Sequence, residues 1–109
     1  GNVYANTNPE QCKRAITDYS QAIRLKPDYA DAYHNRGICF EKTGQKQRAI
    51  EDYNRAILLK PDSYEAYHNR ALIYLNAGKI NDGCHDAQKS CQLGNCTLFE
   101  TAKSKGDCH

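Results

Sequence analysis

The segment AYHNR occurs twice, at residues 32–36 and 66–70, and holds the side chains best suited to chemistry. Histidine can act as a general base or a metal ligand, and asparagine and arginine can hold a ligand. On packed helices His34 and His68 would lie about 8 to 10 Å apart, which is too far for one zinc ion. The sequence also lacks a recurring set of nucleophile, base and carboxylate, a phosphate-binding glycine loop and an HEXXH segment. We therefore expect that the protein is not an enzyme and needs no cofactor.

Six cysteines form a second chemical group, and four of them lie in the segment 84–109. An even count in so short a chain favours disulfides, and therefore a periplasmic or secreted location over a cytoplasmic one. Cys39 lies in an apolar helical pattern and is interpreted as a packing residue. Cys84 and Cys91 are two turns apart on one predicted helix and cannot pair with each other. A bond from Cys108 to Cys91 or Cys96 would tie down the C-terminus, and zinc binding or a redox-active thiol is the alternative.

Charge and hydropathy narrow the classes of partner. The 109 residues include 15 Lys and Arg and 13 Asp and Glu, which are spread along the chain and give a formal net charge of +2. Because there is no basic stripe, no nucleic-acid partner is expected. No apolar segment approaches the roughly 20 residues of a membrane-spanning helix, so no membrane partner is expected either.

The chain contains an internal repeat with a period of about 34 residues. A direct count finds 17 identities in the 26 positions that align residues 11–36 with residues 45–70. A period of this length indicates stacked units, each of which buries its apolar face on its neighbours. Apolar residues recur at helical spacing within each unit, and the segment KTGQK and Pro61 interrupt the helices. The sequence therefore predicts an all-α fold.

These spacings resemble the tetratricopeptide repeat, a helix-turn-helix unit of about 34 residues. Counted from Ala30, seven positions carry the family's small, aromatic or proline residues: Tyr33, Gly37, Phe40, Ala49, Tyr53, Ala56 and Pro61. The resemblance implies a right-handed α-solenoid that forms a single domain over residues 1–109. Its expected parts are the second helix of a partial repeat (9–29), a complete repeat (30–63), a last repeat (64–95) and a capping helix with a cysteine-containing tail (96–109).

The other two repeats depart from the family pattern. The last repeat has Gly83, Ser90 and Asn95 where the family has alanine, alanine and proline, so the resemblance is weaker there. The partial repeat lacks its first helix, which would leave an apolar stripe uncovered. This stripe consists of Ala15, Ile16, Tyr19 and Ile23. A homo-oligomeric scaffold or adaptor that uses the stripe as its interface is therefore an alternative function.

Arg36 and Arg70 each precede an aspartate at the same spacing, Asp52 and Asp86, on the second helix of the same repeat. Because both pairs recur in register, we interpret them as structural ion pairs between helices rather than as ligand or catalytic sites. Asp18 occupies the same place in the partial repeat, and it either pairs with Arg36 or is exposed.

The resemblance also implies a concave groove formed by the first helix of each repeat. Its expected lining residues are Asp31, His34, Asn35, Ile38, Glu41, Lys42, Glu65, His68, Asn69, Leu72, Leu75 and Asn76. Asparagine side chains in a groove can hydrogen-bond the backbone of a bound peptide. We therefore expect a non-enzymatic module that binds a peptide or protein segment. Solvated polar residues on an exposed helix face are the alternative interpretation.

The C-terminal segment predicts a helix over 79–93 and a short amphipathic helix over 97–105. The apolar residues Leu98, Phe99 and Ala102 of the short helix would cover the open end of the solenoid. The spacing of the last three cysteines, in the pattern CxLGxC…GxC, resembles the endings of bacterial tetratricopeptide proteins.

Overall fold

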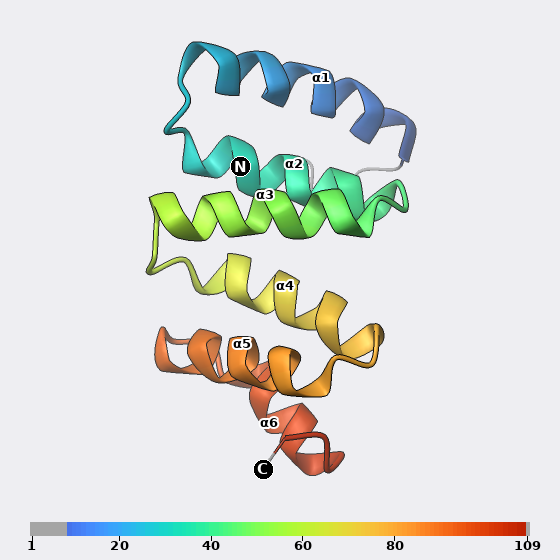
Figure 1. Cartoon of the computed structure of the whole chain (residues 1–109), viewed down its shortest axis with the longest axis vertical. Coiled ribbons are helices and arrows are strands. Elements are labelled where there is room, and N and C mark those ends of the chain that lie inside the picture. The colour runs from blue at the N-terminus through green and yellow to red at the C-terminus, as the bar shows by residue number, and fades with distance from the viewer. Residues whose placement is uncertain (1–8, 109) are drawn as a thin grey trace. The chain divides into compact units, whose positions relative to one another are not determined.

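The computed structural model describes residues 9–108, and every regular element in that range is an α-helix (Figure 1). The all-α fold predicted from the sequence is therefore confirmed. The chain divides into two compact units, Gly1–Pro61 and Asp62–His109, which we call the first and second units. A search of the described helices finds none with the length and apolar character needed to cross a bilayer.

The described residues of the first unit form three helices, α1 (Pro9–Leu25), α2 (Ala30–Lys42) and α3 (Lys46–Leu59) (Figure 1). The helix α2 packs against both α1 and α3. Pro27 follows the end of α1 and Pro61 follows the end of α3, where the chain must leave the helix because proline has no N–H to donate.

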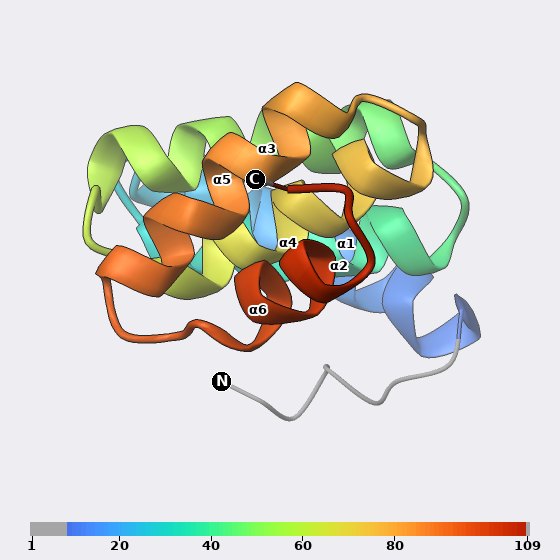
Figure 2. The ribbon, with the colours of Figure 1, turned by 90° about the horizontal axis from the view of Figure 1, so that it is seen from below.

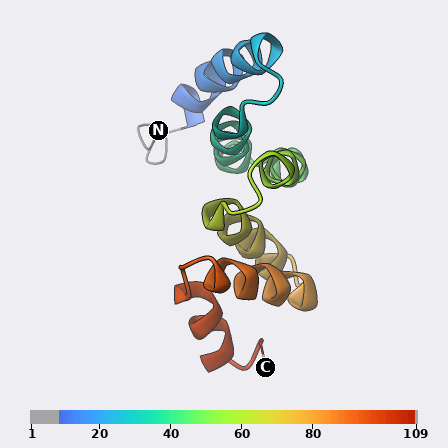
Figure 3. The same ribbon diagram turned by 90° about the vertical axis from the view of Figure 1, so that its left-hand side faces the viewer.

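The second unit also contains three helices, α4 (Tyr64–Asn76), α5 (Ile80–Gln92) and α6 (Thr97–Ser104). The helix α5 packs against both α4 and α6, and α6 crosses α5 at a steep angle (Figure 2, Figure 3). Ala102 of α6 is buried, and Leu98 and Phe99 are half-buried. The short C-terminal helix therefore covers part of α5 with the apolar residues expected from the sequence.

The turns within the two helix pairs α2–α3 and α4–α5 have the same geometry. Gly44 and Gly78 adopt φ values of 81° and 83°, a left-handed conformation that glycine reaches without strain. One residue further, the N–H of Gln45 donates to the carbonyl of Phe40 at 2.7 Å, and the N–H of Lys79 donates to that of Tyr74 at 2.8 Å. These bonds satisfy carbonyls at the helix end and reverse the chain within a few residues.

The first unit buries a small cluster of Cys12, Ala15 and Cys39 between α1 and α2, with Ile16 and Tyr19 packed beside it. This packing changes the expected role of the apolar stripe of α1. Ala15 is only 1% exposed, and the other three residues of the stripe are half-buried. The prediction of an uncovered apolar stripe is therefore wrong for Ala15, because α2 covers this side of α1.

A glycine allows close packing in each helix pair. A Cβ atom on Gly37 of α2 would lie 2.8 Å from Cε1 of Tyr53 on α3, so the tyrosine ring occupies the space that a side chain would need. The Tyr53 hydroxyl donates a hydrogen bond to Glu41 at 2.9 Å. In the second unit a Cβ on Gly83 of α5 would lie 2.6 Å from Cδ2 of Leu75 on α4. The two pairs therefore place their glycine on opposite helices.

Candidate functional site

All six cysteines lie in disulfides: Cys12–Cys39, Cys84–Cys108 and Cys91–Cys96. The expected bond from Cys108 to Cys91 or Cys96 is not the one that the structure contains. Cys39 is buried, as expected of a packing residue, but it is also bonded to Cys12. The two bonds of the second unit lie in the C-terminal region, where the sequence predicted that a disulfide would tie down the chain.

The local chain path explains the pairing in the second unit. After α5 ends at Gln92, the chain turns through Gly94 and brings the Cα of Cys96 within 3.9 Å of the Cα of Cys91. After α6, the N–H of Cys108 donates to the carbonyl of Ala102 at 3.3 Å, which folds the tail back. The tail then reaches α5, where the Cα of Cys84 lies 5.5 Å from that of Cys108.

None of the described cysteines is a free thiol in this structure, so no cysteine thiolate is present to bind zinc. A disulfide is also the oxidised form of a redox-active thiol pair, so the redox alternative stays a hypothesis. Within residues 9–108, no group of three His, Cys, Asp or Glu side chains has the arrangement to hold a metal ion.

The first unit contains the ion pair expected at Arg36. Its Nε and Nη2 atoms each donate to one carboxylate oxygen of Asp52 at 2.8 Å, and Nη1 donates to the Ser20 hydroxyl at 3.1 Å. Asp52 is 3% exposed, and its hydrogen bonds raise the pKa of Arg36 above the ordinary value. The expected alternative partner, Asp18, is exposed. Arg36 therefore links α2 to both α1 and α3.

The second unit repeats the pair with Arg70 and Asp86. The Nε and Nη2 atoms of Arg70 donate to the two carboxylate oxygens of Asp86 at 2.6 and 2.7 Å, and Asp86 is 1% exposed. A bidentate, buried pair of this kind fixes one helix against another, and breaking it would leave a buried charge without compensation. Both arginines therefore act in the structure of their own unit.

The residues expected to line a groove fall on α2 in the first unit and on α4 in the second unit. On α2, His34, Asn35 and Ile38 are half-buried, and Asp31 and Lys42 are exposed. Gly37 packs against Tyr53, and the His34 ring lies 5.8 Å from the same tyrosine ring, so His34 borders the packed face of α2. Glu41 differs from the expectation because it accepts the hydrogen bond of the Tyr53 hydroxyl, and its burial raises its pKa.

On α4, the corresponding face consists of half-buried His68, Asn69, Leu72 and Leu75, with Glu65 and Asn76 exposed at its ends. Leu75 contacts the glycine of α5, so its side chain is partly used in packing. The Nδ1 atom of His68 is buried and has no hydrogen-bond partner among the described residues. Loss of hydration lowers the pKa of His68 below its ordinary value.

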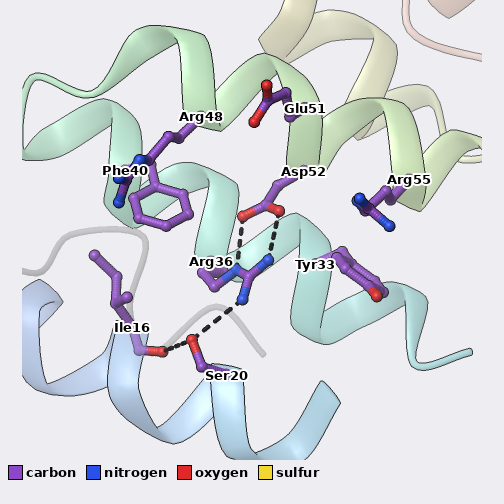
Figure 4. A pocket seen from close by; sticks show the side chains of 9 residues that line it. All are labelled: Ile16, Ser20, Tyr33, Arg36, Phe40, Arg48, Glu51, Asp52 and Arg55. Carbon is purple, nitrogen blue, oxygen red and sulfur yellow. Dashed lines mark hydrogen bonds and ion pairs between the residues drawn. The ribbon is translucent and has the colours of Figure 1, made fainter. Parts of the chain in front are cut away.

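The first unit also contains a pocket of about 400 Å³ that was not predicted from the sequence (Figure 4). Its lining residues come from α1, α2 and α3: Ile16, Ser20, Tyr33, Arg36, Phe40, Arg48, Glu51, Asp52 and Arg55. Figure 4 shows the Arg36–Asp52 pair in its floor, with Arg48 beside Phe40 and Arg55 beside Tyr33. The signal in the sequence is the recurrence of arginine on one face of the segment 48–55, which by itself is equally typical of ordinary surface charge.

Comparison with known proteins gives consistent matches. Three family models match consecutive parts of the chain, described as TPR repeat (residues 10–44), tetratricopeptide repeat (30–63) and tetratricopeptide repeat (52–85). A solved structure titled "Crystal structure of MamA" aligns with a TM-score of 0.74 and 29% sequence identity. The alignment covers 87% of this chain and 52% of the MamA chain, so the present chain spans about half of that protein. A search of curated proteins found no match.

Proposed function

Because the chain belongs to the tetratricopeptide repeat family, we propose that it is a non-enzymatic interaction module that binds protein segments through the polar faces of α2 and α4. Tetratricopeptide repeats and the similarity to MamA support the general assignment to a protein-interaction module. The choice of face and the nature of the partner are our proposal.

The repetition of one polar face in two units carries the proposal. His34 and Asn35 have the same place in the pair α2–α3 as His68 and Asn69 have in the pair α4–α5, and all four are half-buried. Other residues of these helices form the two ion pairs, whereas the His34 ring lies 5.8 Å from that of Tyr53. A repeated amide with apolar neighbours suits a peptide backbone and its side chains.

Apolar side chains accompany the amides on both faces. Ile38 lies one turn after His34 on α2, and Leu72 lies one turn after His68 on α4. Both are half-buried, so part of each side chain is available for contact. We therefore expect the bound segments to combine backbone hydrogen bonds with apolar contacts, which is the usual composition of a peptide-binding surface.

The test starts from peptides selected from a random phage-displayed library against the oxidised full chain. Binding of the selected peptides is then measured by fluorescence anisotropy for wild type and for the double variant Asn35→Ala with Asn69→Ala. Each face loses one amide hydrogen bond, which should weaken binding of its peptide about fivefold, while the thermal midpoint changes little because neither amide lies in the core.

The matched control is Gln47→Ala with Gln88→Ala, which removes two exposed amides, one each from α3 and α5. It should leave peptide binding within about twofold of wild type. Equal affinities for the wild type and the Asn35 and Asn69 variant would refute the proposed faces. A large fall in thermal midpoint for that variant would show that the asparagines are structural.

A further inference from the structure

The pocket of the first unit contains two arginines, Arg48 and Arg55, that do not take part in the Arg36–Asp52 ion pair. Arg36 directs two nitrogens to Asp52 and a third to Ser20, so its charge is compensated inside the fold. Arg48 and Arg55 are exposed, and each lies over an aromatic ring at 5.8 Å, Phe40 and Tyr33 respectively. Neither forms an ion pair with another of the described residues, since the side-chain salt bridges of residues 9–108 involve other groups.

One negative charge opposes these two arginines at the pocket. Glu51 lines the pocket from the same helix and is exposed, whereas Asp52 is neutralised by Arg36. The pocket therefore keeps one positive charge in excess. Guanidinium groups held over aromatic rings are partly oriented already, which lowers the ordering cost of binding a carboxylate.

The spacing of the arginines suggests the form of the ligand. Arg48 and Arg55 are seven residues apart on α3, which corresponds to about 10 Å along a helix. A peptide in the extended polyproline II conformation rises about 9 Å in three residues, and its three residues per turn place residues i and i+3 on the same side. Two carboxylates in the pattern E-x-x-E would therefore reach both guanidinium groups at once.

A smaller pocket of about 150 Å³ adjoins the first one and shares Tyr33 and Arg55 with it. Its other lining residues are Pro27, Leu58 and Leu59, and Leu58 is 80% exposed while Leu59 is 41% exposed. A cavity of roughly this size accommodates a benzene-sized group, so one aliphatic side chain has room. Exposed leucines beside an unneutralised arginine favour a ligand that is apolar next to an acidic residue.

We propose that the first unit binds an extended acidic peptide across α1 and α3, with two carboxylates on Arg48 and Arg55 and an adjacent aliphatic side chain between Pro27 and Leu58. This site is separate from the polar face of α2, because its residues from α2 are Tyr33, Arg36 and Phe40. The protein therefore has a second peptide-binding surface, with a specificity set by charge.

The experiment uses the oxidised full chain and three acetylated, amidated peptides: EGSEL, EGSES, which lacks the aliphatic residue, and KGSKL, which reverses the charges. Binding is followed by chemical-shift changes in a nitrogen-15 correlation spectrum and by fluorescence anisotropy at two salt concentrations. EGSEL should shift amides of the pocket residues on α1 and α3, bind more tightly than EGSES, and bind more weakly at high salt. No binding of EGSEL at millimolar concentration, or equal binding of KGSKL, would overturn the proposal.

Three variants test whether the pocket arginines themselves hold the peptide. Arg48→Gln with Arg55→Gln should weaken EGSEL binding about fivefold or more, and Glu51→Gln should strengthen it because the opposing charge is removed. The matched control Arg14→Gln with Arg24→Gln removes the same charge from exposed positions of α1 outside the pocket and should change binding less than about twofold. An equal effect of this control would mean that only net charge matters, and would refute the site.

The Asn35→Ala and Asn69→Ala variant distinguishes the two surfaces. EGSEL binding should be unchanged in it, whereas peptides selected for the polar faces should lose affinity. If EGSEL binding falls to the same extent, the acidic peptide occupies the polar face and the separate pocket is excluded.

Discussion

Both units contain the same kind of helix pair, but the large side chain that fills the helix contact comes from opposite helices of the pair. In the first unit, Gly37 on the first helix of the pair receives Tyr53 from the second helix. In the second unit, alanine stands at both of these places, and Gly83 on the second helix receives Leu75 from the first. Leu75 therefore occupies the space that the side chain of the family's alanine would need at the position of Gly83. A close helix contact requires a small residue on one helix and a larger side chain opposite it, but either helix can carry either residue.

The disulfides differ between the units in what they fasten. Cys12–Cys39 joins two helices of the first unit, whereas both bonds of the second unit fasten the segment that follows α5. In each unit the middle helix, α2 or α5, packs less extensively on the outer helix, α1 or α6, than on the other helix of its pair. The covalent links thus lie where noncovalent packing is least extensive, at the terminal helices α1 and α6.

The largest expected difference between the units is the cost in unfolding free energy of truncating Tyr53 or Leu75, the side chains that lie against the two glycines. Tyr53→Ala should cost about 3 to 5 kcal/mol of unfolding free energy, because a fully buried ring and its hydrogen bond to Glu41 are lost. Leu75→Ala should cost less, about 1 to 2 kcal/mol, because Leu75 is only half-buried. Urea unfolding of the oxidised protein measures both values. Equal costs would mean that the two helix pairs depend on these side chains to the same degree.

Removal of individual disulfides should give the next largest effects. The bonds Cys12–Cys39 and Cys84–Cys108 span 27 and 24 residues, and each should contribute about 3 to 4 kcal/mol in the chain-entropy model. Cys91–Cys96 spans 5 residues and should contribute about 2 kcal/mol. Variants in which both cysteines of one bond are replaced by alanine can be compared by urea unfolding. Hydrogen exchange should show lost protection in α1 when Cys12–Cys39 is removed and in α6 when Cys84–Cys108 is removed. Lost protection in the opposite helix would contradict this assignment of the bonds.

The glycines offer a smaller and more direct test of the comparison. Gly37→Ala and Gly83→Ala should each destabilise the protein by about 1 to 3 kcal/mol, because the new methyl group overlaps Tyr53 or Leu75. Combining Gly83→Ala with Leu75→Ala should recover part of the loss, since the two changes relieve one overlap. A double-mutant cycle in urea measures the coupling. Additive costs would show that Gly83 and Leu75 do not exclude each other.

The sequence was sufficient for the features that repeat. The internal period located the helices, and the arginine-to-aspartate spacing shared by both repeats located the pairs Arg36–Asp52 and Arg70–Asp86. These features depend on neighbouring helices joined by short turns, so a local pattern carries the information. The contact of Leu75 with Gly83 was not visible, because it depends on which side chain of α4 lies opposite that position.

The features that occur once in the chain could not be predicted. Cys12 and Cys39 lie on different helices, and only the packing of α1 on α2 brings their Cα atoms to 5.0 Å. The pocket of the first unit has the same origin, because α1 contributes Ile16 and Ser20 to its lining and α3 contributes Arg48. An arginine on an exposed face of α3 has no sequence signal that distinguishes a pocket from a solvated surface.

The smallest expected effect concerns the histidines at equivalent places in the two units. His34 lies with its ring 5.8 Å from that of Tyr53, whereas the second unit has alanine in place of this tyrosine. The buried Nδ1 of His68 has no hydrogen-bond partner among residues 9–108, and loss of hydration lowers its pKa below the ordinary 6.5. The unfolded chain therefore binds a proton at a higher pH than the folded chain does.

This difference makes stability depend on pH in one direction. As pH falls below about 6.5, protonation of His68 in the unfolded state should lower the unfolding free energy, until the folded state also becomes protonated. His68→Gln stays neutral and should reduce this dependence between about pH 7 and pH 5, measured as the difference in urea midpoint from wild type. Glu41, whose pKa is raised by burial, acts in the opposite direction and is present in both proteins, so its contribution cancels in the difference. An unchanged pH profile in the variant would mean that the buried nitrogen of His68 is solvated in solution and carries no electrostatic cost.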